Sequence, residues 1–139
     1  MQGSQAYVRS RDWPLPARAL NLEVMAQDGD YVLWEQDGYS LKLWPCSREV
    51  NQVLSQAVQQ VTGTAPLLVV PVNSDGGSFL RYDIPTSTLG TYDRQQKDRG
   101  FHSPKDNLNR VVMKRLPEAV EILYRFIINN DILGDNGQD

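Results

Sequence analysis

The feature that most constrains the fold is an amphipathic stretch that begins after Ser47 and ends before Gly63. Its apolar side chains recur at helical spacing, and the opposite face carries uncharged polar groups. Serine is a favoured N-cap and glycine a favoured stop, so the pattern predicts a helix over residues 48–62. A helix with one apolar face must pack against another layer of structure. The apolar face consists of Val50, Val53, Leu54, Ala57, Val58 and Val61.

Residues before this helix predict a β-hairpin. Residues 31–36 and 39–44 are rich in β-branched and aromatic side chains, and they flank Asp37 and Gly38. Asp-Gly between two such runs is typical of a type I′ turn, because that turn needs positive φ at both central residues. Residues 17–27 fit both helical and strand spacing, and we favour a helix there while keeping the strand open.

Two further strands are expected after the helix. The apolar run 66–72 is typical of a strand that is buried on both faces, and residues 78–84 are expected to return beside it. Residues 73–77 form the turn between them. Residues 85–102 show no periodicity, which predicts a long loop of the kind that is often functional.

The C-terminal part predicts helices. Ser103, Pro104 and Asp106 make a good helix start, with serine as N-cap, proline in the first turn and an acid near the N-terminus. Pro117 is expected to break or kink this helix. A second helix is expected over residues 118–130, and it is apolar on most sides.

These elements predict a single α+β domain in which an antiparallel or mixed sheet of four or five strands packs against three or four helices. The 139 residues are enough for one domain with its own core. We expect residues 1–16 to be loosely ordered, because Pro14 and Pro16 disfavour regular helix. We expect residues 17–133 to form the domain and residues 134–139 to be a flexible acidic tail.

The charge distribution points to one binding segment. Seven of the 14 basic side chains lie within residues 94–115, which hold only two acidic ones. Basic and aromatic side chains together can bind an acidic protein or grip nucleic-acid phosphates, and a helix start at Ser103 would add an anion site. A solvated loop without a ligand is the alternative. The candidate residues here are Tyr92, Arg94, Lys97, Arg99, Phe101, His102, Lys105 and Arg110.

The uncharged face of the 48–62 helix is a second candidate surface. Charged residues are depleted in protein interfaces, so this face fits either the rim of an interface or a wet surface that lacks charge. The candidate residues on this face are Gln52, Gln56 and Gln59.

Catalytic and metal chemistry find little support in the sequence. Cys46 is the only cysteine and His102 the only histidine, and neither has a partner at a recognisable spacing. The acidic pair Asp28 and Asp30 fits turn conformation better than catalysis. We therefore expect no catalytic residue, no metal site and no cofactor.

The sequence thus favours a non-enzymatic protein-binding module, such as an adaptor, chaperone, immunity-type or assembly factor. The alternative is a nucleic-acid accessory protein that binds phosphates through residues 92–115, and an enzyme of unrecognised type ranks last. We expect a protein partner or self-association. No stretch is apolar enough for a membrane span, and a lone cysteine without a signal peptide favours the cytoplasm.

Overall fold

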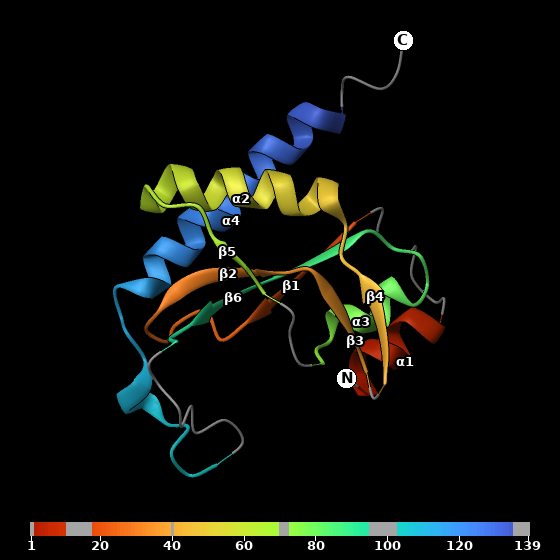
Figure 1. Ribbon diagram of the computed structural model, residues 1–139, viewed down its shortest axis with the longest axis horizontal. Coiled ribbons are helices and arrows are strands. Elements are labelled where there is room, and N and C mark those ends of the chain that lie inside the picture. Colours follow the sequence, from red (N-terminus) through yellow and green to blue (C-terminus); the bar gives the residue numbers. More distant parts are fainter. Residues whose placement is uncertain (1, 11–17, 40, 70–72, 95–102, 135–139) are drawn as a thin grey trace.

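A four-stranded mixed sheet forms the centre of the fold in the computed structural model, which describes residues 2–10, 18–39, 41–69, 73–94 and 103–134 (Figure 1). The strand order is β1-β6-β2-β5. Strand β6 runs parallel to β1 and antiparallel to β2, and β2 runs parallel to β5. The strands are β1 (Ala19–Glu23), β2 (Asp30–Trp34), β5 (Leu67–Val69) and β6 (Thr86–Tyr92).

Helices lie on both sides of this sheet. The two long helices, α2 (Arg48–Thr62) and α4 (Arg115–Gly134), cross each other over one face (Figure 1). The short helices α1 (Gln2–Ser10) and α3 (Gly76–Leu80) lie at the other side, next to the hairpin of β3 (Gln36–Tyr39) and β4 (Lys42–Pro45). The predicted fold class, an α+β domain with a mixed four-stranded sheet, is confirmed. No helix in the described part of the chain is long and apolar enough to cross a membrane.

The main core lies between the sheet and the two long helices. The prediction for α2 is confirmed: the Ser47 side chain accepts a hydrogen bond from the backbone N–H of Val50, and Gly63 ends the helix in the left-handed conformation. Fully buried side chains such as Leu89 of β6 and Ile122 of α4 each contribute about 1.5–3 kcal/mol by leaving water. The core cluster contains Tyr31, Leu33, Val50, Val53, Leu54, Ala57, Val58, Leu89, Ile122 and Phe126.

The predicted hairpin over residues 31–44 is wrong in its register. Asp37 and Gly38 lie inside β3, where they pair with Trp44 and Leu43, instead of forming the turn. Tertiary contacts override the local preference for a turn, because the Asp37 side chain is completely buried and hydrogen-bonded. Strand β2 accordingly pairs with β6 and β5 and not with the following strand.

Three stretches have a different structure from the predicted one. Residues 19–23 form strand β1, so the favoured helix over residues 17–27 is wrong and the strand alternative holds. Residues 76–80 form helix α3, and the strand expected over 78–84 is absent from these described residues. Residues 86–92, expected to be loop, form the central strand β6. Its threonines are β-branched and fit a strand that is buried on both faces.

The helix predicted from Ser103 is also wrong. Ser103 and Asp106 belong to a turn in which the Asp106 N–H donates to the Ser103 carbonyl oxygen over 2.9 Å. A short 3₁₀ helix follows at Leu108–Arg110, and α4 begins only at Arg115. Pro117 therefore lies in the first turn of α4, where proline is tolerated because its missing N–H has no helical partner.

Near the N-terminus, residues 2–10 form helix α1 where loose structure was expected. Val8 is completely buried, and the Ser4 hydroxyl donates a hydrogen bond of 2.7 Å to Asp75. The two prolines cited for that expectation, at positions 14 and 16, lie outside the described residues, as do residues 135–139 of the predicted acidic tail.

Candidate functional site

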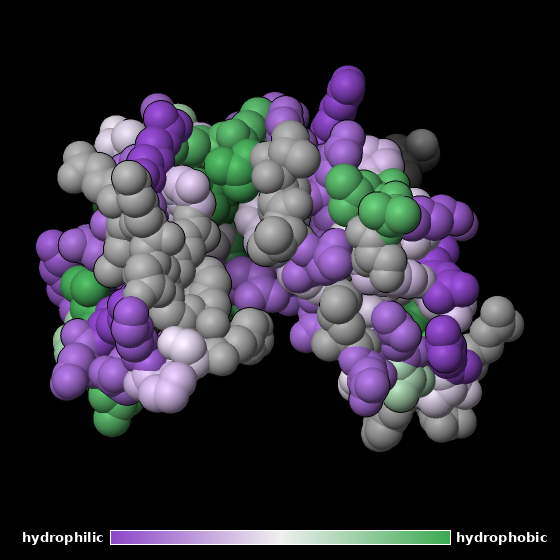
Figure 2. Space-filling model, turned by 60° about the horizontal axis from the view of Figure 1, so that its bottom comes forward, coloured by the Kyte–Doolittle hydropathy of each residue, from purple (hydrophilic) through white to green (hydrophobic). Residues whose placement is uncertain are grey.

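The carboxyl ends of the parallel strands β1 and β6 form the most distinctive polar site of the described chain. Ligands of open α/β sheets commonly bind outside the carboxyl ends of strands. Strand β1 ends at Glu23, and its register partner on β6 is Gly90. Leu20 packs against the core under the long helices, so strand alternation places Asn21 and Glu23 on the opposite face. In Figure 2, which brings the lower side of Figure 1 forward, hydrophilic residues cover much of the described surface.

The residue after Glu23 has a strained backbone. Val24 has a φ of 53°, in the left-handed region that a β-branched side chain rarely adopts. The Thr91 hydroxyl of β6 donates a hydrogen bond to the Val24 carbonyl oxygen and helps to hold this conformation. Strained residues of this kind are concentrated at functional sites, where the surrounding structure fixes them. The strain therefore marks this end of β1 as a candidate site.

Asn21 connects Glu23 to the rest of this face. Its amide nitrogen lies 2.8 Å from the Ser74 hydroxyl and 3.4 Å from both the Glu23 carboxylate and the Thr88 hydroxyl. The short bond to Ser74 fixes the amide, and the longer contact orients Glu23. Asn21 thus joins the end of β1 to the loop that precedes α3.

The Asp37 side chain anchors the loop that precedes α3. It is fully buried and accepts hydrogen bonds from the backbone N–H groups of Gly38 and Ser74, at 2.6 and 3.0 Å, and from the hydroxyls of Ser74 and Thr88. Four donors satisfy a carboxylate that burial alone would strongly destabilise. A Cβ on Gly77 would lie 2.5 Å from the Cα of Gly38, so α3 can approach β3 this closely only with glycine.

A second polar cluster holds the start of α4 against the same end of the sheet. Arg115 donates to Glu118 over 2.9 Å and to the Gly29 carbonyl oxygen, and its guanidinium lies 5.1 Å from the centre of the Tyr31 ring. The Tyr31 hydroxyl donates to Glu118 over 3.2 Å. Burial, and then the negative charge of Glu118, raise the pKa of Tyr31 to about 12. This cluster is structural, since every member has an internal partner.

The predicted basic segment starts at this same end of the sheet. Tyr92, half-buried, is the last residue of β6, and exposed Arg94 follows two positions later. Lys105 is exposed and Arg110 half-buried in the turns that lead to α4. Four residues of the segment, Lys97, Arg99, Phe101 and His102, lie outside the described residues. The part that the structure describes therefore brings only Tyr92 and Arg94 near the carboxyl end of β6.

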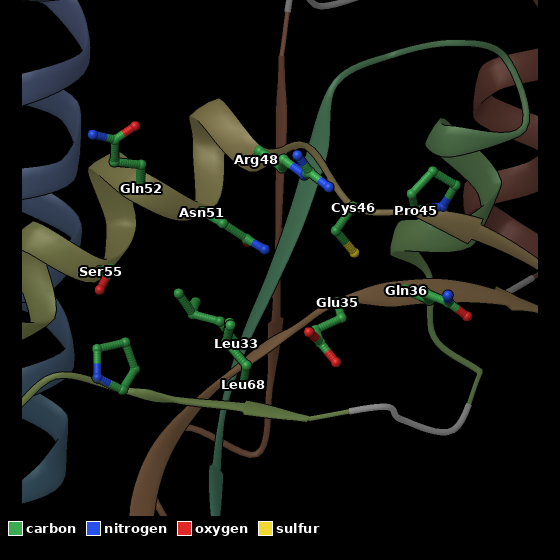
Figure 3. Close-up of a pocket in the computed structure, with 11 residues that line it drawn as sticks. Leu33, Glu35, Gln36, Pro45, Cys46, Arg48, Asn51, Gln52, Ser55 and Leu68 are labelled. Carbon is green, nitrogen blue, oxygen red and sulfur yellow. The ribbon is translucent and has the colours of Figure 1, made fainter.

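The glutamine face of α2 borders a separate cavity of about 610 Å³ (Figure 3). Gln52 lines it together with Arg48 of the same helix, while Glu35 lies on the opposite, strand side. Gln56 and Gln59 are exposed farther along α2 and are not part of its lining. Cys46 also lines the cavity, and burial, followed by the charge of Asp37, raises the pKa of its thiol to about 12. A thiol with so high a pKa stays protonated and is a poor nucleophile.

A metal centre needs several ligand side chains close together. The side chains of the described ranges contain no group of three or more His, Cys, Asp or Glu that could hold an ion. A zinc site needs three or four such ligands. Glu23 by itself is not a metal centre, so the described part of the chain does not form one.

Comparison with known proteins identifies the family. The model of peptidase family M28 matches residues 1–127, which is most of the chain. The chain therefore belongs to peptidase family M28. No curated protein sequence matches it.

Three solved structures with a similar fold are aminopeptidases by name. The aminopeptidase from Aneurinibacillus sp. strain AM-1 superposes with a TM-score of 0.69 at 19% identity, covering 91% of this chain and 29% of that one. A zinc aminopeptidase from Bacillus subtilis, BSAP, superposes with a TM-score of 0.68 at 17% identity. The match covers 91% of this chain and 32% of that one. LapA aminopeptidase from Legionella pneumophila superposes with a TM-score of 0.68 at 14% identity. The match covers 91% of this chain and 34% of that one. The chain thus spans about a third of the length of these structures.

The family corrects the functional interpretation of the sequence. The predicted non-enzymatic binding module is wrong, as is the preference for a protein without enzymatic activity, because the match to a peptidase family covers residues 1–127. Sequence reasoning also missed Glu23 and Asn21. The alternation of Leu20, Asn21, Leu22 and Glu23 was the available signal, and the preference for a helix over residues 17–27 concealed it.

Proposed function

We propose that this chain is part of an aminopeptidase, an enzyme that removes residues from the amino ends of peptides. The observation that carries the proposal is the match of the peptidase family M28 model to residues 1–127. The aminopeptidase names of the similar structures support this specificity within the family. The carboxyl ends of β1 and β6, with Glu23, are the part of the chain that contributes to the active site.

Glu23 would recognise the substrate's amino terminus. An aminopeptidase must distinguish a free α-ammonium group from a blocked one, and a carboxylate is the complementary charge. Glu23 is half-buried, so its interaction with a cation is stronger than on an open surface. Asn21 is a positioning residue, because its amide contacts Glu23 on one side and Ser74 on the other.

Zinc is considered because the similar structure from Bacillus subtilis is a zinc aminopeptidase. The residues of this chain that the structure describes do not fit such an ion, since they include no cluster of three ligand side chains. We assign no step of the reaction to a metal. The contribution of these residues is to bind and orient the peptide.

The test measures hydrolysis by the protein that contains this chain, purified from its source organism. Pairs of peptides that differ only in a free or an acetylated amino terminus are assayed with and without added Zn²⁺. We expect rapid release of the first residue from the free peptides and at least 100-fold slower release from the acetylated ones. Equal rates for both, or no hydrolysis under either condition, would disprove the proposal.

Glu23→Gln tests the assigned role directly. It removes the charge with little change in shape, so KM for free peptides should rise about tenfold or more, the effect of losing a charge-assisted hydrogen bond. The matched control is Glu121→Gln on the exposed side of α4, where Glu121 only pairs with Arg125. An unchanged KM in Glu23→Gln would remove Glu23 from the site without affecting the family assignment.

The cellular compartment stays a prediction of the sequence. Cys46 is a free thiol, which favours a reducing compartment such as the cytoplasm. Fractionation of the source organism with an antibody against the chain tests this location.

A further inference from the structure

The cavity beside α2 lies at the opposite end of the sheet from Glu23. Strand β1 reaches Glu23 next to the carboxyl end of β6. The cavity lies near the amino end of β6, where the Ser47 N–H, directly before α2, donates to the Thr86 carbonyl oxygen over 2.8 Å. The chain neighbours of Ser47, Cys46 and Arg48, both line the cavity. A ligand in this cavity would therefore leave the candidate active-site end open.

The floor of the cavity is an apolar part of the sheet that α2 does not cover. Leu33 of β2 and Leu68 of β5 are register partners, so their side chains lie next to each other on the same face. Leu33 is 1% exposed under the long helices, whereas Leu68 is 59% exposed on the edge strand. The buried side chain of Cys46 adds a further apolar contact. This floor is suited to the apolar side chains of a ligand.

Two opposite charges stand on opposite walls of the cavity. Arg48 belongs to the α2 wall and Glu35 to the strand wall (Figure 3). Neither side chain makes an ion pair or a hydrogen bond within the part of the chain that the structure describes. An arginine binds a carboxylate through a planar pair of N–H donors, and a carboxylate binds an ammonium group. The two walls therefore fit a ligand with a carboxylate at one end and an ammonium group at the other.

The α2 wall also offers neutral hydrogen-bonding groups. The Asn51 amide donates to the Trp34 carbonyl oxygen over 3.0 Å and accepts from the Ser87 hydroxyl, and these bonds fix the helix against the sheet. Gln52 and Ser55 follow on the same flank of the helix and line the cavity. Their side chains make no hydrogen bond with any described residue, so they are available to the amide groups of a peptide.

We propose that this cavity binds a short peptide with both ends free, its carboxylate on Arg48, its amino group on Glu35 and its apolar side chains on Leu68. The volume of about 610 Å³ lies within the range of small-ligand sites and is too small for a folded partner. The charges on the two walls and the polar groups between them identify the ligand, so its assignment does not rest on the proposed function. Peptides of this kind are also what an aminopeptidase leaves after each cleavage.

NMR titration of the full ¹⁵N-labelled chain with leucyl-glycyl-leucine tests the site. We expect saturable amide shifts, with a Kd of about 1 mM or below, in β2, β5 and the first half of α2. Proton spectra verify that the peptide stays intact during the titration. Shifts confined to the ends of β1 and β6, or no saturation up to about 10 mM peptide, would overturn the proposal.

Blocked forms of the same peptide test the two charged ends. The N-acetylated and the C-amidated peptide should each bind at least tenfold more weakly, because each loses one charge-assisted contact. Leucine alone carries both charges on one carbon and cannot reach both walls, so it should also bind at least tenfold more weakly. Equal affinity for leucine, or for both blocked peptides, would overturn the assignment of a peptide with free ends.

Two variants assign each end to its wall. Arg48→Gln should weaken binding of the free peptide at least fivefold and leave binding of the amidated peptide unchanged, since that form has no carboxylate. Glu35→Gln should behave in the same way toward the acetylated peptide. Arg125→Gln and Glu121→Gln are the matched controls, because these residues pair with each other on α4. An unchanged affinity for the free peptide, or equal weakening of free and blocked forms, would overturn the proposal. Binding is measured without hydrolysis, so its failure would leave the proposed function untouched.

Discussion

Gly90 lies directly against the backbone of Glu23. A Cβ at position 90 would be 2.6 Å from the Glu23 carbonyl oxygen, well inside van der Waals contact. Gly90→Ala should therefore push β1 away from β6 and lower the free energy of unfolding by about 1–3 kcal/mol, as overpacking does. Urea unfolding measures the loss. Gly3→Ala is the control, because nothing lies within 4 Å of its Cβ position in α1. Equal stability of the two variants would contradict this packing.

The buried carboxylate of Asp37 gives a second prediction. Asp37→Ala leaves the Ser74 N–H and the hydroxyls of Ser74 and Thr88 without their acceptor, so the free energy of unfolding should fall by about 3 kcal/mol or more. Asp28→Ala removes an exposed hydrogen bond from the Gly29 N–H, so the free energy of unfolding should change by less than about 1 kcal/mol. Denaturant unfolding of both variants provides the measurement. Similar losses would mean that the Asp37 bonds are not a principal stabilising network.

Asp37 also shows where sequence reasoning fails. Asp-Gly is a strong local signal for a turn, and α2 shows that local signals can succeed, since its cap, stripe and stop all agree with the structure. At Asp37 a buried network across three distant segments overrides the local preference, and no spacing along the chain reveals it. The lesson applies to strands in general, because pairing is set by contacts that are far apart in sequence.

The candidate site was hidden for the same reason. The sequence of strand β6 is typical of a polar loop. Its threonines are nevertheless buried, because β1, β2 and α3 surround the strand. Glu23 becomes notable only when β1 is placed beside β6 and the φ of Val24 is known. The basic segment within residues 94–115 was predicted from its charge. Its first residue, Arg94, lies two positions after the end of β6, and its role in binding stays a prediction.

The thiol of Cys46 should be inert in the folded protein. The residue is 6% exposed, and its pKa is raised to about 12, so almost no thiolate exists at neutral pH. A thiol reagent such as Ellman's reagent should label the native protein at least 100-fold more slowly than the urea-unfolded protein at the same pH. Cys46→Ser provides the blank, because it is the only cysteine of the chain. Labelling of the native protein at the unfolded rate would show that this side chain is accessible.

The raised pKa of Tyr31 predicts how the free energy of unfolding changes at alkaline pH. Its pKa rises from 10 in the unfolded chain to about 12 in the fold, chiefly through burial and then through Glu118. The folded state therefore holds the phenol proton more tightly, and this contribution to stability is complete below pH 10 and is lost as the pH rises toward 12. Tyr31→Phe cannot ionise, so the difference in unfolding free energy between wild type and variant should shrink across that interval. Urea unfolding at half-unit steps of pH measures it. A difference that stays constant up to pH 12 would mean that the Tyr31 phenol ionises equally in both states.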